Sequence, residues 1–145
     1  MPRRKADAAA VVFALLVVAT VAAFAYAQRV KRDPQIIDRV GIGTKKSNVF
    51  TPKGQCDRRI KLKFRTTTSN DGTVEIIRPG GEIVSVLAKK EFLKRYTIHT
   101  YFWTGKNDHG VIQPAGRYRI RVLLEDEGRE LTLPGTIRLH DRGHC

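Results

Sequence analysis

Residues 102–122 read FWTGKNDHGVIQPAGRYRIRV, and this stretch decides the fold of the chain. Its first residues end an aromatic and β-branched run, YTIHTYFW, which predicts a strand over residues 96–103. A glycine-rich connection and the turn sequence QPAG follow. Polar and apolar residues then alternate from Arg117 to Leu124, which predicts a second strand. Its inner face carries Tyr118, Ile120, Val122 and Leu124.

The same period of two recurs on both sides of this stretch. Ile60, Leu62 and Phe64 alternate with basic residues, and the segments TVEIIR and EIVSVL flank a Pro-Gly-Gly turn in the manner of a hairpin. We interpret KKEFLKR (89–95) as a charged break between strands, and residues 131–139 as one or two last strands around a Pro-Gly pair. About seven short strands separated by turn residues predict an all-β fold. The expected architecture is an immunoglobulin/fibronectin-like β-sandwich over residues 49–145.

Six residues in the deciding stretch have roles that their chemistry predicts. The tryptophan buries its ring between the sheets, and the tyrosine packs inward while its hydroxyl finds a backbone partner. Two glycines permit positive φ in the connecting loop, and a proline with a third glycine sets a tight turn. These residues are Trp103, Gly105, Gly110, Pro114, Gly116 and Tyr118. The alternative is an exposed platform for carbohydrate or peptide, formed by Tyr101, Trp103 and Tyr118.

This spacing of tryptophan, glycines, Pro-x-Gly-x-Tyr and an alternating strand resembles the immunoglobulin-like domain of flagellar hook-capping proteins. Upstream, VFTPKG (49–54) is similar to the Phe-Ser-Pro-Asn-Gly opening of the same domains in bacterial secreted and membrane-anchored proteins. The likeness covers about residues 49–140 and implies an immunoglobulin-like fold in an extracytoplasmic setting. The sequence departs from the family at Lys53, Gln55 and Cys56, so a calcium-type oxygen cluster is not implied. The flagellar role belongs to whole proteins and does not transfer with a domain.

Residues 8–27, AAAVVFALLVVATVAAFAYA, contain no charge, glycine or proline. A helix of this length spans roughly 30 Å, the thickness of the hydrocarbon core of a bilayer. We therefore predict a transmembrane helix here, after a cytoplasmic tail (1–7) and before a stalk (28–48), whose apolar residues offer an edge strand as the alternative. The Ala-Tyr-Ala ending at Ala27 leaves a second interpretation open, a signal segment that is cleaved.

Basic residues flank this segment on both sides, three before it and three after it. The positive-inside rule therefore does not decide the orientation. Long domains cross the membrane largely regardless of charge, so we predict a cytoplasmic N-terminus and an extracytoplasmic C-terminal domain. The expected protein is a single-pass membrane protein of a bacterial cell envelope, with the lipid bilayer as a partner through residues 8–27.

The net charge of +13 and the sequence pI near 10.3 indicate anionic partners. Residues 1–48 carry 9 basic and 3 acidic residues, and residues 49–145 carry 18 and 11, so neither part holds the whole excess. No block of five or six like charges occurs. Basic residues alternate with apolar ones, as Lys61, Lys63 and Arg65 do, which is typical of the wet face of a strand. This pattern argues against nucleic acid and favours an envelope protein or an anionic wall polymer as partner.

The sequence offers no catalytic constellation. Neither Cys56 nor Cys145 lies in a nucleophile signature, Gly-x-Ser-x-Gly is absent, and the acidic run EDEG (125–128) is typical of a solvated hairpin tip. We predict a protein that is not an enzyme and has no cofactor. The two cysteines form a disulfide in an oxidising compartment or remain separate thiols.

Metal binding has one weak candidate, the terminal sequence HDRGHC (140–145), whose donors suit zinc or copper but match no known spacing. His99 and His109 are expected to be packed or exposed histidines rather than ligands. We predict no metal site.

Overall fold

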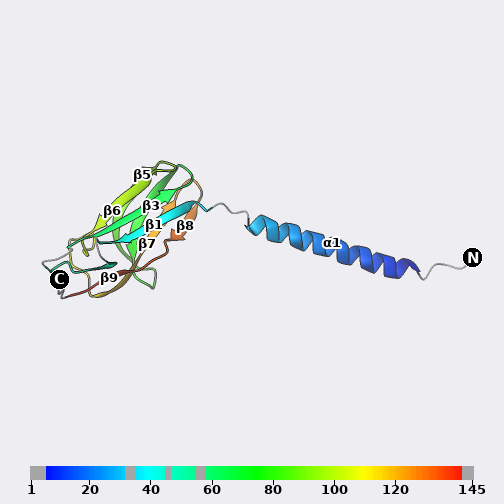
Figure 1. Cartoon of the computed structure of the whole chain (residues 1–145), viewed down its shortest axis with the longest axis horizontal. Helices are drawn as coiled ribbons and strands as arrows, with labels where there is room; N and C mark the ends of the chain where they lie inside the picture. Colours follow the sequence, from blue (N-terminus) through cyan, green and yellow to red (C-terminus); the bar gives the residue numbers. More distant parts are fainter. Residues whose placement is uncertain (1–5, 32–34, 45–46, 55–57, 142–145) are drawn as a thin grey trace, which may run out of the picture. The chain divides into compact units, whose positions relative to one another are not determined.

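A computed structural model of the chain describes residues 6–31, 35–44, 47–54 and 58–141. The chain divides into two compact units, Met1–Gln35 and Ile36–Cys145. The described part of the first unit is a helix, and the second unit contains the strands (Figure 1).

The helix α1 (Ala6–Lys31) contains the apolar segment that the sequence predicts to cross a membrane. Its residues Ala8–Arg29 are long and apolar enough to span a bilayer, and none of their side chains is buried within the chain. The one internal hydroxyl, Thr20 Oγ1, donates to the Leu16 carbonyl at 2.8 Å, so the helix satisfies its own polar group. A signal sequence near an N-terminus has the same length and composition.

Nine strands form two sheets over the described residues of the second unit. They are β1 (Ile37–Gly43), β2 (Val49–Phe50), β3 (Ile60–Thr66), β4 (Asn70–Ile77), β5 (Ile83–Leu93), β6 (Ile98–Trp103), β7 (Gly116–Leu124), β8 (Arg129–Thr132) and β9 (Ile137–Leu139). One sheet has the order β1-β3-β6, and the other has the order β2-β9-β7-β4-β5 with β8 beside β7. Figure 1 shows β1, β3 and β6 side by side.

This connectivity is that of an immunoglobulin-like sandwich. Strands β1, β3 and β6 take the places of A, B and E, while β4, β7 and the pair β8–β9 take those of C, F and G. The short β2 pairs with β9 in parallel, and β5 extends the second sheet beyond β4. The β-sandwich that the sequence predicts is therefore confirmed. Nine strands appear instead of about seven because the structure adds β1 and the two-residue β2, neither of which was among the predicted strands.

The predicted stalk over residues 28–48 is wrong in its second half. β1 occupies Ile37–Gly43 and pairs with β3 from Ile37↔Thr66 to Gly43↔Lys61, so the alternative of an edge strand is correct. Ile36 is buried in the core. The sandwich domain therefore starts at Ile36 rather than at residue 49, because the apolar residues of this segment cover the open edge of β3.

Two other predicted boundaries also move. The segment KKEFLKR does not separate two strands, because β5 continues through it to Leu93. The Leu93 side chain is fully buried, whereas Lys89 and Lys90 face solvent at the sheet edge. The strand predicted from Tyr96 starts at Ile98 instead, because Tyr96 has φ of +57° and lies in a tight turn. In that turn the Thr97 amide donates to the Lys94 carbonyl.

Trp103 lies in the core between the sheets. Its indole is 2% exposed and makes edge contacts with Phe50 and Tyr118, at ring centroid distances of 5.5 and 4.9 Å. The indole Nε1 donates to the Lys106 carbonyl at 2.8 Å, so the buried polar atom is satisfied. The surrounding core draws on both sheets and includes Ile60, Leu62, Phe64, Val74, Ile76, Ile120, Val122, Leu124, Ile137 and Leu139.

Tyr118 forms a tyrosine corner between β6 and β7. Its ring is buried, and its hydroxyl donates to the Pro114 carbonyl at 2.7 Å, four residues upstream, as immunoglobulin-like domains do at this corner. Burial raises the pKa of this hydroxyl, which keeps the donor protonated. The inward ring and the backbone partner predicted for Tyr118 are confirmed.

Two glycines allow the loop between β6 and β7 to take its backbone conformation. Gly105 has φ of +76°, and a Cβ there would clash with the Pro52 ring and approach Leu139 Cδ1 to 2.9 Å. Gly110 has φ of +78° at the loop tip, with open space around it. Both positive φ values agree with the prediction. Gly116 opens β7, and the corner beside it is closed by the tyrosine hydroxyl.

Trp103→Ala should reduce the free energy of unfolding by about 3 to 5 kcal/mol, because it removes the largest ring of the core and leaves a cavity. Thermal unfolding of a fragment from Gln35 to Cys145, which retains β1, measures the effect. Since 1 kcal/mol moves the midpoint by about 4 °C in a domain of this size, we expect a drop of roughly 12 °C or more. The matched control is Phe102→Ala, which removes an exposed neighbour on the same strand. A shift below about 2 °C for Trp103→Ala would contradict its role in the core.

Candidate functional site

The outer face of the three-stranded sheet is the most distinctive surface of the domain. Strand register places three rows across β1, β3 and β6: Gly43, Lys61 and Phe102; Gly41, Lys63 and Thr100; and Arg39, Arg65 and Ile98. Alternate residues of β3 are buried, so these rows point away from the core. We name this surface, together with Arg59 just before β3, the basic face.

Most cations of the basic face have no acidic partner among the described residues. Arg65 is the exception, because its Nε donates to Asp38 Oδ1 at 2.9 Å and a second guanidinium nitrogen contacts Oδ2. This hydrogen-bonded pair holds the pKa of the Asp38 carboxyl below its usual value. Within the described chain, Arg39, Arg59, Lys61 and Lys63 form neither an ion pair nor a side-chain hydrogen bond. Among the described residues, Arg59, Lys61 and Lys63 therefore carry positive charge that no carboxylate compensates, whereas Arg39 and Arg65 both interact electrostatically with Asp38.

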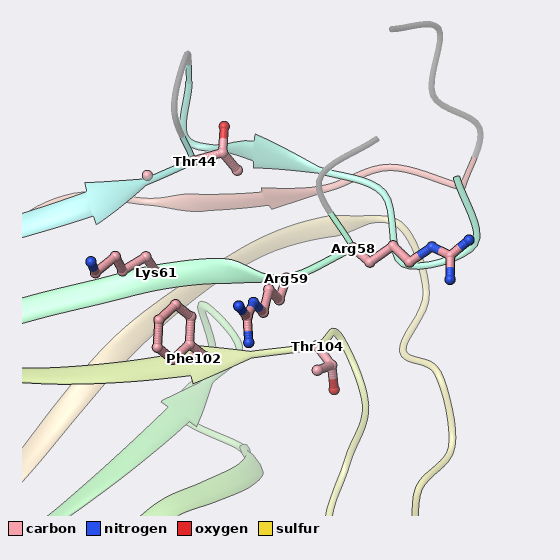
Figure 2. A pocket seen from close by; sticks show the side chains of 7 residues that line it. Thr44, Arg58, Arg59, Lys61, Phe102 and Thr104 are labelled. Carbon is pink, nitrogen blue, oxygen red and sulfur yellow. The ribbon is translucent and has the colours of Figure 1, made fainter. Parts of the chain in front are cut away.

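One end of the basic face is hollowed into a cradle. Its lining residues are Gly43, Thr44, Arg58, Arg59, Lys61, Phe102 and Thr104, and its volume is about 600 Å³, within the range of ligand sites. Figure 2 shows Arg59 beside the Phe102 ring, with Lys61 next to them on β3 and Thr44 across from them. Arg58 points away from this group, and its Nε donates to the Gly54 carbonyl at 3.3 Å.

Phe102 organises the two cations of the cradle. The Arg59 guanidinium carbon lies 4.4 Å from the ring centroid, and Lys61 Nζ lies 5.8 Å from it. Such cation–π contacts orient the charged groups without neutralising them. A guanidinium held in this way offers its planar fork of N–H donors to a carboxylate or phosphate. The cradle is thus suited to an anionic group.

The second sheet differs, because the described arginine at its centre, Arg121, is paired on both sides. Arg121 donates to Glu75 at 2.8 Å and to Glu130 at 3.1 Å, and this network raises its pKa against the opposing effect of burial. Arg78 pairs with Glu82 at 2.8 Å. At one end, Arg117 and Arg138 lie directly opposite each other on β7 and β9, beside a shallow hollow. This arginine pair is the second candidate for anion binding.

The platform of Tyr101, Trp103 and Tyr118 considered from the sequence is wrong. Trp103 and Tyr118 are each 2% exposed, so their rings are not available to a ligand. Tyr101 is partly buried and stacks on Phe64 at a centroid distance of 5.8 Å. Its position in the interior raises the pKa of its hydroxyl, with Glu91 adding to the effect.

The remaining sequence candidates do not assemble into a site among the described residues. Residues 125–128 form an exposed hairpin tip, as predicted. His99 Nε2 lies 3.1 Å from the Lys94 carbonyl, and His109 is exposed. In the described ranges, no group of three His, Cys, Asp or Glu side chains could hold a metal ion. Cys56, Cys145 and His144 lie outside these ranges, so the choice between a disulfide and two separate thiols falls outside the described residues.

Comparison with known proteins gives no relative to guide the assignment: no protein-family model matches the chain, and no curated protein matches it significantly. The resemblance to the immunoglobulin-like domain of hook-capping proteins therefore stays a prediction. The candidate site has to be argued from its own residues.

Sequence reasoning found part of the basic face and missed its cradle. The alternation of Lys61, Lys63 and Arg65 was visible, but the contribution of Arg59 and Phe102 depends on the β3–β6 register. A usable signal was the basic stretch RRIKLKFR (58–65) together with the two glycines spaced by one residue in β1.

Asp38→Asn tests how charge is distributed on the basic face. The substitution releases Arg65, so the full chain should elute from a sulfonate resin at higher salt than the wild type. Asp71→Asn, which removes an exposed carboxylate of β4, is the matched control and should shift elution less. Protonation of Asp38 removes the same charge as the substitution. Because pairing lowers the pKa of Asp38, the salt concentration at which the wild type elutes should approach that of the variant only when the pH falls below the usual titration range of an aspartate. Equal shifts for both variants would indicate that only net charge matters.

Proposed function

We propose that the protein is a membrane-anchored, non-catalytic binding or structural module of a bacterial envelope, with its sandwich domain outside the cytoplasmic membrane. The observation that carries this proposal is the combination of an apolar helix with a sandwich whose basic face holds three cations, Arg59, Lys61 and Lys63, without an acidic partner among the described residues. An adhesion, assembly or spacer role is consistent with a binding domain that is tethered to a membrane helix. The resemblance to hook-capping-type domains supports the bacterial, extracytoplasmic setting.

The chemical groups that line the cradle support binding as the proposed role of the domain. The cradle offers guanidinium, ammonium and hydroxyl groups, which bind anions, but its described lining contains neither a general base nor an activated nucleophile. The histidines of the described domain lie elsewhere. Binding is therefore the function that this geometry supports best.

A second candidate function is narrower: an accessory module that binds an anionic cell-wall glycopolymer for a cell-wall-processing enzyme. The basic face favours it, because residues 36–145 carry 21 basic and 12 acidic residues, and because Arg59, Lys61 and Lys63, which have no carboxylate partner among the described residues, lie along one face of the three-stranded sheet. The lipid bilayer is the partner of α1, and a wall polymer or an envelope protein is the partner of the domain.

Protease treatment of intact spheroplasts tests the location of the domain. We expect digestion of the sandwich domain from outside, while a cytoplasmic control protein survives. Protection of the domain until the membrane is lysed would contradict the proposed orientation. The N-terminal residue of the mature protein then separates anchoring from secretion, since a chain beginning at Gln28 has lost the helix.

Retention on purified wall polymer should fall steeply as salt rises past physiological strength. Exposed charges are screened within about 8 Å at that ionic strength, and the cations of the basic face are at the surface. Sedimentation of the full chain with the polymer across a salt series measures this dependence, with an uncharged polysaccharide as the control. Retention that is absent at low salt, or insensitive to salt, would remove the second candidate function.

A further inference from the structure

The basic face contains a trough that runs along β1 and β3. Gly41 and Gly43 face Lys63 and Lys61 across the β1–β3 pair, so the β1 side of these rows has no side chain. Two hollows result, the cradle at Gly43 and a smaller one of about 150 Å³ at Gly41, which Arg39, Lys63 and Ile98 help to line. A strand edge without side chains beside a row of lysines gives an extended ligand room to lie along the sheet.

The cations beside the trough are regularly spaced. Alternate residues of a strand are separated by roughly 6.6 Å, so Lys61 and Lys63 follow Arg59 at similar intervals. All three have no carboxylate partner in the described chain, whereas Arg65 at the far end of the row is neutralised by Asp38. The attraction for anions is therefore strongest toward the cradle.

The cradle also lies at the end of the domain opposite the point where the chain enters it. Ile37 pairs with Thr66 at one end of β1, and Gly43 pairs with Lys61 at the other, six residues or about 20 Å further along. A binding site placed there lies at the opposite end of β1 from Ile36, the first residue of the sandwich unit.

Nucleic acid fits this surface poorly. Proteins that bind single strands present several aromatic rings on which successive bases stack. Phe102 is the one aromatic side chain in the three rows of the basic face, and Arg59 already lies over its ring. Threonine hydroxyls and apolar patches beside regularly spaced cations suit a sugar chain that carries anionic groups.

We propose that the trough over Gly41 and Gly43 binds an extended anionic glycopolymer, with one carboxylate or phosphate held by Arg59 and Lys61 in the cradle and the next near Lys63. This inference rests on the second candidate function and adds the site and the direction of the polymer. The cradle fixes one anionic group, and the trough sets the path of the neighbouring sugars along β3.

The test measures binding of the full chain, held in nanodiscs of a zwitterionic lipid, to immobilised polymers. The probes are polygalacturonate, which carries carboxylates, and dextran phosphate, which carries phosphates, with uncharged dextran as the blank. We expect binding to at least one charged polymer, and the stronger of the two identifies the anionic group. Single-stranded DNA and vesicles of anionic lipid are the competing probes, and both should bind more weakly.

Two sets of variants locate the site. Arg59→Gln with Lys61→Gln should lower the affinity roughly tenfold or more and reduce the slope of log affinity against log salt by about two, one for each lost contact. The matched control, Arg117→Gln with Arg138→Gln, removes the same charge from the other sheet and should have a clearly smaller effect.

The glycine variants test the trough without changing charge. Gly41→Val fills it, and a Cβ at this position would lie 3.8 Å from Lys63 Cβ, an ordinary contact, so the melting temperature should not fall. Binding should weaken roughly tenfold. Gly116→Val is the matched control, because it also adds a side chain to an exposed strand glycine with room around it, and it should leave binding unchanged.

The outcomes distinguish failure of the second candidate function from failure of the proposed binding site. If neither charged polymer binds the wild type at low salt, the second candidate function fails and the trough proposal fails with it. If polymer binds but the cradle and Gly41→Val variants behave like the wild type, the function stands and the proposed site is wrong. Sensitivity to the Arg117/Arg138 or Gly116 variants would instead place the site on the second sheet. Tighter binding to DNA or to anionic vesicles would overturn the glycopolymer as partner.

Discussion

The burial of one indole between two sheets is the constraint on which the rest of the domain depends. Trp103 ends β6, contacts Phe50 beside β9 and Tyr118 on β7, and hydrogen-bonds to the loop that follows it. Because its ring touches both sheets, it fixes their separation at this end of the sandwich. The residue just before it, Phe102, must then point outward, and this places an aromatic ring under Arg59. Two consecutive residues thus have separate roles: Trp103 packs in the core, and Phe102 contributes to the candidate site.

The fold was largely accessible from the sequence because its strands are half buried. Ile60, Leu62 and Phe64 alternate with cations, and the sheet buries one set and exposes the other. Three boundaries failed where local pattern and tertiary pairing disagree. β1 carries two glycines and little alternation, and its place depends on the free edge of β3. Residues 89–91 are charged and lie at a sheet edge, where they face solvent. Tyr96 takes a positive φ, which the presence of a tyrosine does not predict.

The candidate site was less accessible, because charge compensation is a property of pairs distant in sequence. Nothing local distinguishes Arg65, which is neutralised by Asp38, from Lys63, which has no acidic partner among the described residues. The arginines of β7 looked equivalent to the lysines of β3, yet Arg121 is held between Glu75 and Glu130. Only the register across strands shows which cations remain available. The register also shows that the two glycines of β1 lie opposite the two lysines of β3. The trough results from this pairing, which neither the glycine pattern nor the lysine pattern predicts alone.

The antiparallel pairing of β1 with β3 has a mechanical consequence. The chain enters at one end of β1, and the cradle lies at the other end, so a pull between them runs lengthwise along the two strands. Hydrogen bonds between the strands are then perpendicular to the force, and the whole ladder resists sliding together. A ladder pulled from its side would open one bond at a time. The domain is therefore arranged to carry tension along its length without peeling its first strand away.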